Sequence, residues 1–171
     1  DSIVWMREDF NAHIFVQLII KAPEVYSGAF LSEEVIMKRM LTGLQPTGVI
    51  TLGNYIGAIK QMVKNQDEYE SFIFVADLHA ITVPNDDLNL KEKTRSLVGL
   101  YLACGIDPEK ATIYIQSDVV ETLELYLYLN MNAYLGELSR VTTFKEKARK
   151  QPDNVNAGLF TYPTLMAADI L

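Results

Sequence analysis

Apolar residues along most of this chain fall into short runs of strand length that alternate with longer segments of helical periodicity. Three short runs predict strands, over residues 39–42, 71–76 and 111–116. The second reads Ser-Phe-Ile-Phe-Val-Ala and is nearly continuous in apolar side chains, which is typical of a central strand covered on both faces. The strand pattern therefore indicates a sheet with a buried interior.

Apolar positions with a 3.6-residue period predict a helix after each strand. The first, over about 52–65, should turn one face inward: Tyr55, Ile59, Met62 and Val63. A second should begin at an Asn89 cap and run to about residue 103, where Gly105 and Pro108 end it. Its inward residues should be Leu97, Leu100 and Tyr101. The third should cover about 121–137, with Leu and Tyr residues from 123 to 138 in a core or a subunit interface.

Strands that alternate with helices predict an α/β fold in which a parallel sheet is covered by helices. Three strands with their crossovers amount to the first half of a Rossmann-like nucleotide-binding domain. Ligands of such sheets bind beyond the carboxyl ends of the strands. The residues that the sequence places at those ends are Gly43, Gln45, Asp77, His79, Gln116, Ser117 and Asp118.

Composition narrows the class of protein. The 171 residues are 49% hydrophobic, enough for one core, and the formal net charge of −7 means that any contact with nucleic acid must rest on a local basic patch. Cys104 is the single cysteine, so no internal disulfide can form and a reducing compartment, the cytoplasm, is expected. We expect no membrane span, because the apolar run over 14–20 is too short.

Residues 1–36 carry no motif that indicates any chemistry, and we expect no targeting segment there, since the start is acidic. Met37 directly precedes the first predicted strand and could be a natural start. We therefore expect an unassigned extension over 1–36 and a partial catalytic domain over 37–171.

A glycine-punctuated loop follows the first strand and leads into the first helix. Gly43, Gly48 and Gly53 allow tight turns and close approach of a ligand, Pro46 stiffens the loop, and a helix start presents N–H groups to an anion. The loop matches neither the Walker motif nor the dinucleotide fingerprint. Taken alone it could be an ordinary strand–helix turn.

The order Pro46-x-Gly48-x-x-x-x-Gly53-Asn54 resembles the first signature of the class I aminoacyl-tRNA synthetases. Thr51 and Asn54 stand where that signature usually has two histidines, a replacement typical of the tryptophanyl branch. Four further motifs resemble the same branch, in its bacterial type and in the same order: residues 77–82, 136–138, 144–147 and 161–171. The resemblance covers about 38–171 and implies the first half of the catalytic domain.

The resemblance implies a ligase that uses ATP and Mg²⁺ to activate tryptophan, transfers it to tRNA(Trp), and works as a homodimer. It assigns catalytic roles to Thr51, Asn54 and Lys147. It assigns ATP contacts to Gln45, Pro46, Thr47, Gly48, Thr51, Gly53 and Asn54. It assigns tryptophan contacts to Leu41, Gln45, His79, Tyr162, Met166 and Asp169, where Leu41 stands at a position that is often Phe in bacterial members.

Asp169 lies in a mostly apolar helical segment, three residues after Met166, so its carboxylate should lie on or beside a buried face. A fixed carboxylate is a suitable acceptor for the indole N–H, which can only donate. An Asp paired to a neighbouring Lys is the alternative. His79 could similarly be a hydrogen-bonded histidine at a strand end, and Asp77 could cap the next turn.

Two other functions stay open at this point. A tyrosyl-tRNA synthetase shares the fold and the chemistry, and a phenol hydroxyl can also donate to Asp169. A catalytically silent nucleotide-binding fragment would keep the fold without the reaction. The basic run of Lys145, Lys147, Arg149 and Lys150 is most simply a solvated helix face, with Lys147 as the exception that the resemblance singles out.

Overall fold

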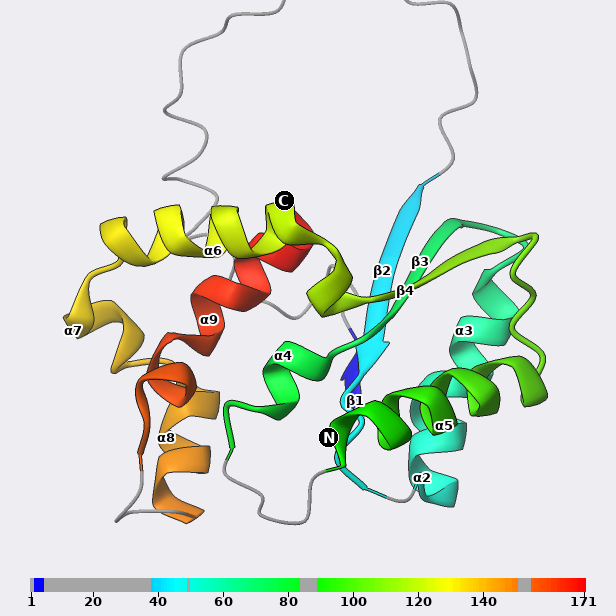
Figure 1. Cartoon of the computed structure of the whole chain (residues 1–171), viewed down its shortest axis with the longest axis horizontal. Helices are drawn as coiled ribbons and strands as arrows, with labels where there is room; N and C mark the ends of the chain where they lie inside the picture. Colours follow the sequence, from blue (N-terminus) through cyan, green and yellow to red (C-terminus); the bar gives the residue numbers. More distant parts are fainter. Residues whose placement is uncertain (1, 5–37, 49, 84–88, 151–154) are drawn as a thin grey trace, which may run out of the picture.

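The structure is a computed structural model that describes residues 2–4, 38–48, 50–83, 89–150 and 155–171. Three parallel strands lie in sequence order: β2 (Arg39–Leu44), β3 (Glu70–Val75) and β4 (Ala111–Ile115). This parallel sheet and its crossover helices confirm the predicted α/β, Rossmann-like first half (Figure 1).

An unpredicted strand completes the sheet. β1 (Ser2–Val4) pairs antiparallel with β2 at the outer edge, with Ser2 opposite Leu44 and Val4 opposite Thr42. It belongs to residues 1–36, for which no strand was predicted. The strand order is therefore β1-β2-β3-β4.

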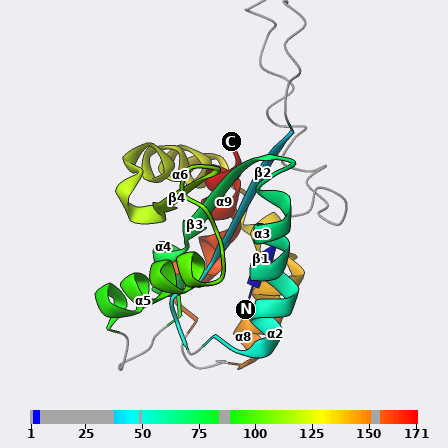
Figure 2. The same cartoon turned by 90° about the vertical axis from the view of Figure 1, so that its right-hand side faces the viewer.

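The predicted helix over 52–65 consists of three pieces that follow one another as a single rod (Figure 2). α2 (Leu52–Asn54) leads into a π-helical turn, η1 (Tyr55–Ile59), and then into α3 (Lys60–Asn65). Ile59 and Met62 are buried as expected, but Tyr55 is 38% exposed, so its predicted inward position is wrong. The local π-turn changes which side chains face the sheet, and a fixed 3.6-residue period cannot anticipate that.

α5 (Leu90–Ala103) has the predicted cap and end. The Asn89 side chain accepts a hydrogen bond from the Glu92 amide, and Gly105 adopts a left-handed conformation with φ of 102° directly after the helix. Leu97 and Tyr101 are buried and Leu100 packs against the same core. That core fills the space between β3, the η1–α3 rod and α5.

The predicted helix over 121–137 is broken. α6 (Val120–Asn132) ends where Ala133 and Tyr134 are extended, and α7 (Leu135–Leu138) starts after them. α8 (Thr142–Lys150) and α9 (Ala157–Ile170) complete the chain. Figure 1 shows α6 to α9 as a group on the far side of α4 (Asp77–Ala80) from α3 and α5. None of the helices in the described ranges has the length and apolar character needed to cross a bilayer.

Candidate functional site

Asp169, near the end of α9, meets the ends of two strands. Its Oδ2 accepts a hydrogen bond from His79 Nε2 at 2.9 Å, and its Oδ1 accepts one from Gln116 Nε2 at 2.7 Å. The side chains of His79 and Asp169 are 3% and 5% exposed. A carboxylate only accepts, so the His79 proton in this bond is on Nε2. Helix α9 thus brings a buried acid to the carboxyl edge of the sheet.

Gln116 connects both partners of this cluster. It begins η2 (Gln116–Asp118), the 3₁₀ turn after β4, and it is 1% exposed. Its amide nitrogen donates to Asp169, and its carbonyl oxygen accepts from the His79 backbone N–H at 3.4 Å. Among the described residues, the partners of Asp169 are therefore an imidazole and an amide, and not the Lys of the alternative prediction.

The charge on Asp169 also acts on a neighbouring phenol. Burial raises the pKa of the Tyr114 hydroxyl to about 12, and the Asp169 carboxylate adds to that rise. Burial disfavours the charged phenolate, and the Asp169 carboxylate disfavours a second negative charge beside it. Tyr114 therefore stays neutral at physiological pH.

Asp77 has a different role from His79, although both follow β3. Its Oδ1 accepts from the backbone N–H of Leu78 and of Ser117, and its Oδ2 accepts from the Ser117 hydroxyl. These bonds join α4 to η2 and so fix the spacing between the ends of β3 and β4. Asp77 is the first residue of α4 and Ala76 is its N-cap, without a side-chain capping bond, so the predicted capping role of Asp77 is wrong and its carboxylate instead links α4 to η2.

Tyr162 and Met166 lie on the buried side of α9, 7% and 4% exposed. Helix α6 packs along α9, where the hydroxyls of Tyr126 and Thr161 lie 2.7 Å apart and the Thr164 hydroxyl donates to Asn130 Oδ1. Asn156 caps the start of α9 by accepting from the Leu159 amide. The helix that carries Asp169 is thus held along its length.

The signature loop is stabilised by its own side chains. Thr51 Oγ1 accepts from the Asn54 amide at 3.3 Å, and Asn54 Oδ1 accepts from the Thr51 amide at 3.0 Å. This reciprocal capping box occupies one of the helix-start N–H groups that the sequence left open to an anion. Thr51 is exposed and Asn54 half-buried, at the start of α2.

The three glycines of the loop differ in their surroundings. Gly43 belongs to β2, and a Cβ there would lie 2.7 Å from the Phe74 carbonyl oxygen. The absence of a side chain at Gly43 therefore allows β2 to approach β3. This close packing, rather than the predicted ligand contact, explains why a glycine stands there. A Cβ added at Gly48 would meet no described atom within 4 Å, and one added at Gly53 would meet Thr51 Oγ1 at 3.5 Å, so both glycines leave room beside the loop.

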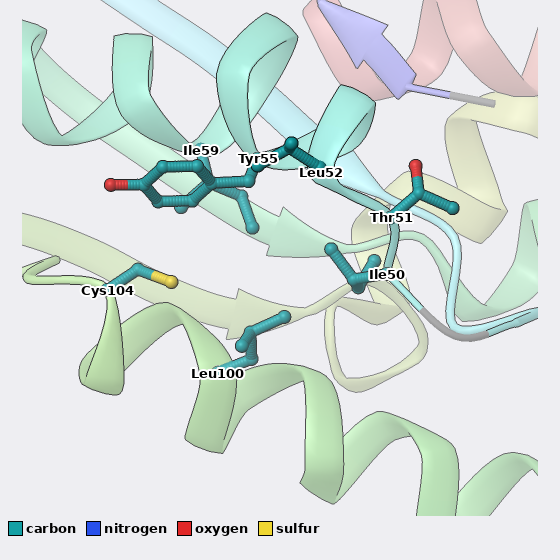
Figure 3. A pocket seen from close by; sticks show the side chains of 7 residues that line it. All are labelled: Ile50, Thr51, Leu52, Tyr55, Ile59, Leu100 and Cys104. Carbon is teal, nitrogen blue, oxygen red and sulfur yellow. The ribbon is translucent and has the colours of Figure 1, made fainter.

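The remaining predicted loop residues lie between β2 and α2. Pro46 is buried, whereas Gln45 and Thr47 are half-buried, as is Leu41 within β2. An apolar hollow of about 320 Å³ opens on the helix side of this loop (Figure 3). Its lining residues come from the loop, the η1 rod and α5: Ile50, Thr51, Leu52, Tyr55, Ile59, Leu100 and Cys104. None of the predicted tryptophan contacts lines it.

Lys147 lies in α8, and its side chain is outside the described part of the structure. Lys145 and Arg149 of the same helix are exposed, in agreement with a solvated face. The rings of Phe144 and Phe160 meet edge to face at 5.1 Å and hold α8 against α9. No group of three or more His, Cys, Asp or Glu side chains in the described ranges could hold a metal ion.

Comparison with known proteins now decides the family. The sequence profile described as "tRNA synthetases class I (W and Y)" matches residues 37–171. The chain belongs to this family.

Similar class I synthetases include tryptophanyl enzymes of bacteria. The tryptophan–tRNA ligase of Porphyromonas gingivalis is 63% identical over 135 residues, and that of Listeria monocytogenes is 57% identical over 136 residues; each match covers 79% of this chain and 41% of the relative. A crystal structure of the tryptophanyl-tRNA synthetase from Campylobacter jejuni, in complex with ADP and tryptophan, matches with a TM-score of 0.72 and 46% identity over 78% of this chain and 41% of that chain. The predicted resemblance to the bacterial tryptophanyl branch is confirmed.

This synthetase chain spans about two fifths of the length of those relatives.

Two residues have clear structural roles that were not predicted from the sequence. Gln116 was placed only at a strand end, and Tyr101 only in the core, whereas its hydroxyl accepts from the Leu44 amide and donates to the Phe74 carbonyl oxygen. Periodicity reports that a side chain is inward, but it does not report which polar atom it meets.

Proposed function

We propose that this chain carries the first half of the catalytic domain, over 37–171, of an enzyme that activates tryptophan with ATP and transfers it to tRNA(Trp). The observation that carries the proposal is the buried Asp169 carboxylate, fixed by His79 and Gln116 at the carboxyl edge of the parallel sheet. Beyond these two bonds the carboxylate keeps acceptor capacity for a third donor, such as an indole N–H. Tyr162 and Met166, on the same helix, would line the rest of the tryptophan pocket.

The reaction is an in-line displacement at phosphorus. A carboxylate oxygen of tryptophan forms a bond to the α-phosphorus of ATP, the bond to the bridging oxygen breaks, and pyrophosphate leaves with those electrons. A ribose hydroxyl of tRNA then attacks the activated carbonyl carbon and AMP departs. Neither step needs a protein nucleophile, so the contribution of the protein is positioning and charge stabilisation.

The loop from Gln45 to Asn54 would hold ATP. Gly48 and Gly53 leave space for a ligand beside the backbone, and Thr51 and Asn54 would exchange part of their mutual bonding for phosphate oxygens or ribose hydroxyls. Gln45, directly after β2, would contact both substrates. Lys147 would add positive charge near the phosphates. The Mg²⁺ that the family resemblance implies would arrive on the phosphates of ATP, because the described residues offer no cluster to hold it.

ATP–pyrophosphate exchange with single amino acids tests this function. We expect exchange above background with tryptophan and none with tyrosine. The rate with tryptophan should be low, because this chain spans only part of the length of its relatives. Exchange that depends on tyrosine would favour the tyrosyl alternative. A folded chain that neither catalyses exchange nor binds tryptophan would favour the silent fragment.

We also propose that the protein forms a homodimer through the outer face of α6 and α7. Apolar side chains there are largely exposed: Leu127 54%, Tyr128 66%, Met131 72%, Tyr134 67% and Leu135 72%. Their exposure places these five side chains outside the core that the described residues form, and it favours the alternative prediction of a subunit interface. The lone Cys104 and the family fit a cytoplasmic location.

The interface can be tested by sedimentation equilibrium of the full chain. Met131→Lys should weaken self-association at least tenfold, because it places a charge in an apolar contact, whereas Gln61→Lys, an equal change of charge at an exposed position of α3, should not. A dissociation constant that is the same for both variants would contradict this interface.

A further inference from the structure

Gln116 is a buried amide for which the reaction itself has no use. It lies at the end of β4, and both ends of its side chain are hydrogen-bonded to groups from other elements. The NH₂ group bonds Asp169 of α9, and the carbonyl oxygen accepts from the backbone of His79 in α4. One side chain therefore ties the end of β4 to α4 and α9, the two helices that carry His79, Tyr162, Met166 and Asp169.

The two bonds on Asp169 come from different directions and engage different oxygens. His79 Nε2 holds Oδ2 and Gln116 Nε2 holds Oδ1, so rotation of the carboxylate about its last bond would break both. A carboxylate offers about four acceptor positions, and two are used here. Where the remaining lone pairs point is therefore fixed before any ligand arrives, and that direction depends on Gln116 as much as on His79.

We propose that Gln116 is a positioning residue for amino-acid selection: it orients Asp169 so that a free lone pair meets the indole N–H of tryptophan. This inference rests on the proposed function. A site whose acceptor is fixed in advance gains more from a correctly placed donor than a mobile acceptor does, because no side-chain freedom is lost on binding. It also discriminates better against a donor placed elsewhere, such as a phenol hydroxyl.

The neutrality of the amide matters as much as its geometry. Gln116 donates without adding charge, so Asp169 keeps its negative charge for the ligand, whereas a Lys at this place would neutralise it. His79 and Tyr114 are titratable groups beside the carboxylate, and the pKa of Tyr114 is raised to about 12.

Gln116→Glu gives the sharpest test, because it keeps the shape of the side chain and makes its hydrogen-bond donation to Asp169 depend on pH. When the introduced carboxyl is ionised, it repels Asp169 and donates nothing. When it is protonated, its O–H can donate to Asp169 as the amide did. Burial and the neighbouring Asp169 raise the pKa of the introduced carboxyl above the ordinary value of about 4.3, so recovery should fall within the range from about pH 5 to 8.

The readout is the tryptophan dissociation constant of the full chain, measured by calorimetry across that pH range and divided by the wild-type value at each pH. We expect a loss of at least tenfold at pH 8 that shrinks toward the wild-type value as the pH falls. The ratio removes those pH effects on tryptophan binding that do not depend on residue 116. The preference for tryptophan over tyrosine should fall at pH 8 and recover in parallel.

A matched control is available in Gln66, the other buried glutamine among the described residues. It is 8% exposed, and both ends of its side chain are also hydrogen-bonded: it donates to the Gly105 carbonyl oxygen at 3.0 Å and accepts from the Asp107 amide at 2.8 Å. Gln66→Glu should lower the urea midpoint without changing the tryptophan affinity ratio at any pH. Gln116→Met, which removes both bonds without a charge, should lose affinity equally at all pH values.

The outcomes separate this inference from the function on which it rests. The positioning role is supported if the tryptophan affinity of Gln116→Glu recovers at acid pH and that of Gln66→Glu shows no such change. A wild type that binds tryptophan, together with a Gln116→Glu variant of equal affinity at every pH, overturns the positioning role and leaves the function intact. A folded wild type that binds no tryptophan overturns both. Losses of the same size and pH dependence in Gln66→Glu would show a general stability effect and would also overturn it.

Discussion

Asp169→Asn is expected to weaken tryptophan binding about 100-fold, while the fold is kept. The variant has nearly the same shape, but the charged acceptor becomes a neutral amide. One oxygen that accepted from His79 or Gln116 is replaced by an NH₂ group, so two donors face each other in a buried site. Calorimetric titration with tryptophan measures the loss.

Two controls make this result specific. Asp118→Asn is the same substitution at an exposed position of the same sheet edge, and it should leave the affinity unchanged. A tryptophan analogue in which sulfur replaces the indole N–H should bind the wild type weakly and should lose little further affinity in Asp169→Asn. If the analogue and tryptophan lose affinity equally, Asp169 does not read the N–H.

Gly43→Ala is expected to lower the free energy of unfolding by about 2 kcal/mol. The added Cβ would lie 2.7 Å from the Phe74 carbonyl oxygen and 2.8 and 2.9 Å from two atoms of its ring. The carbonyl belongs to β3 and cannot withdraw without disturbing its pairing with β2. The Tyr101 hydroxyl, which bonds Leu44 and Phe74 beside this point, limits that movement further.

Urea unfolding of the full chain measures the effect, and Gly99→Ala is its matched control. Gly99 lies inside α5 with nothing within 4 Å of an added Cβ, so the same change should stabilise by up to about 1 kcal/mol through helix propensity. Opposite signs for the two variants are the expected result. A Gly43→Ala variant as stable as the wild type would mean that β2 and β3 can separate at low cost.

The sequence predicted the parallel sheet because strand length, apolar runs and helical periodicity are local signals. β2, β3 and β4 lie within two residues of their predicted ends, and the capping role of Asn89 and the turn at Gly105 were both found from local chemistry. Asp169 and His79, singled out in separate motifs 90 residues apart, are hydrogen-bonded in the structure. The family resemblance predicted that both residues contact tryptophan, because their spacing in the sequence alone could not predict a shared site.

What the sequence missed depends on contacts between distant segments. The role of Gln116 needs β4, α4 and α9 in place, and the role of Tyr101 needs the ends of β2 and β3. The π-turn at Tyr55–Ile59 and the break at Ala133 and Tyr134 are changes of backbone geometry within otherwise helical patterns. Hydrophobic periodicity does not distinguish a continuous helix from one interrupted by a turn of this kind.

Calorimetric titration of the folded chain with tryptophan, and separately with tyrosine, would show whether Asp169 selects the amino acid. We expect saturable heat with tryptophan alone, and its loss in Asp169→Ala. Equal binding of tyrosine, or binding of tryptophan that survives in Asp169→Ala, would contradict the reading of Asp169 as the acceptor that selects tryptophan.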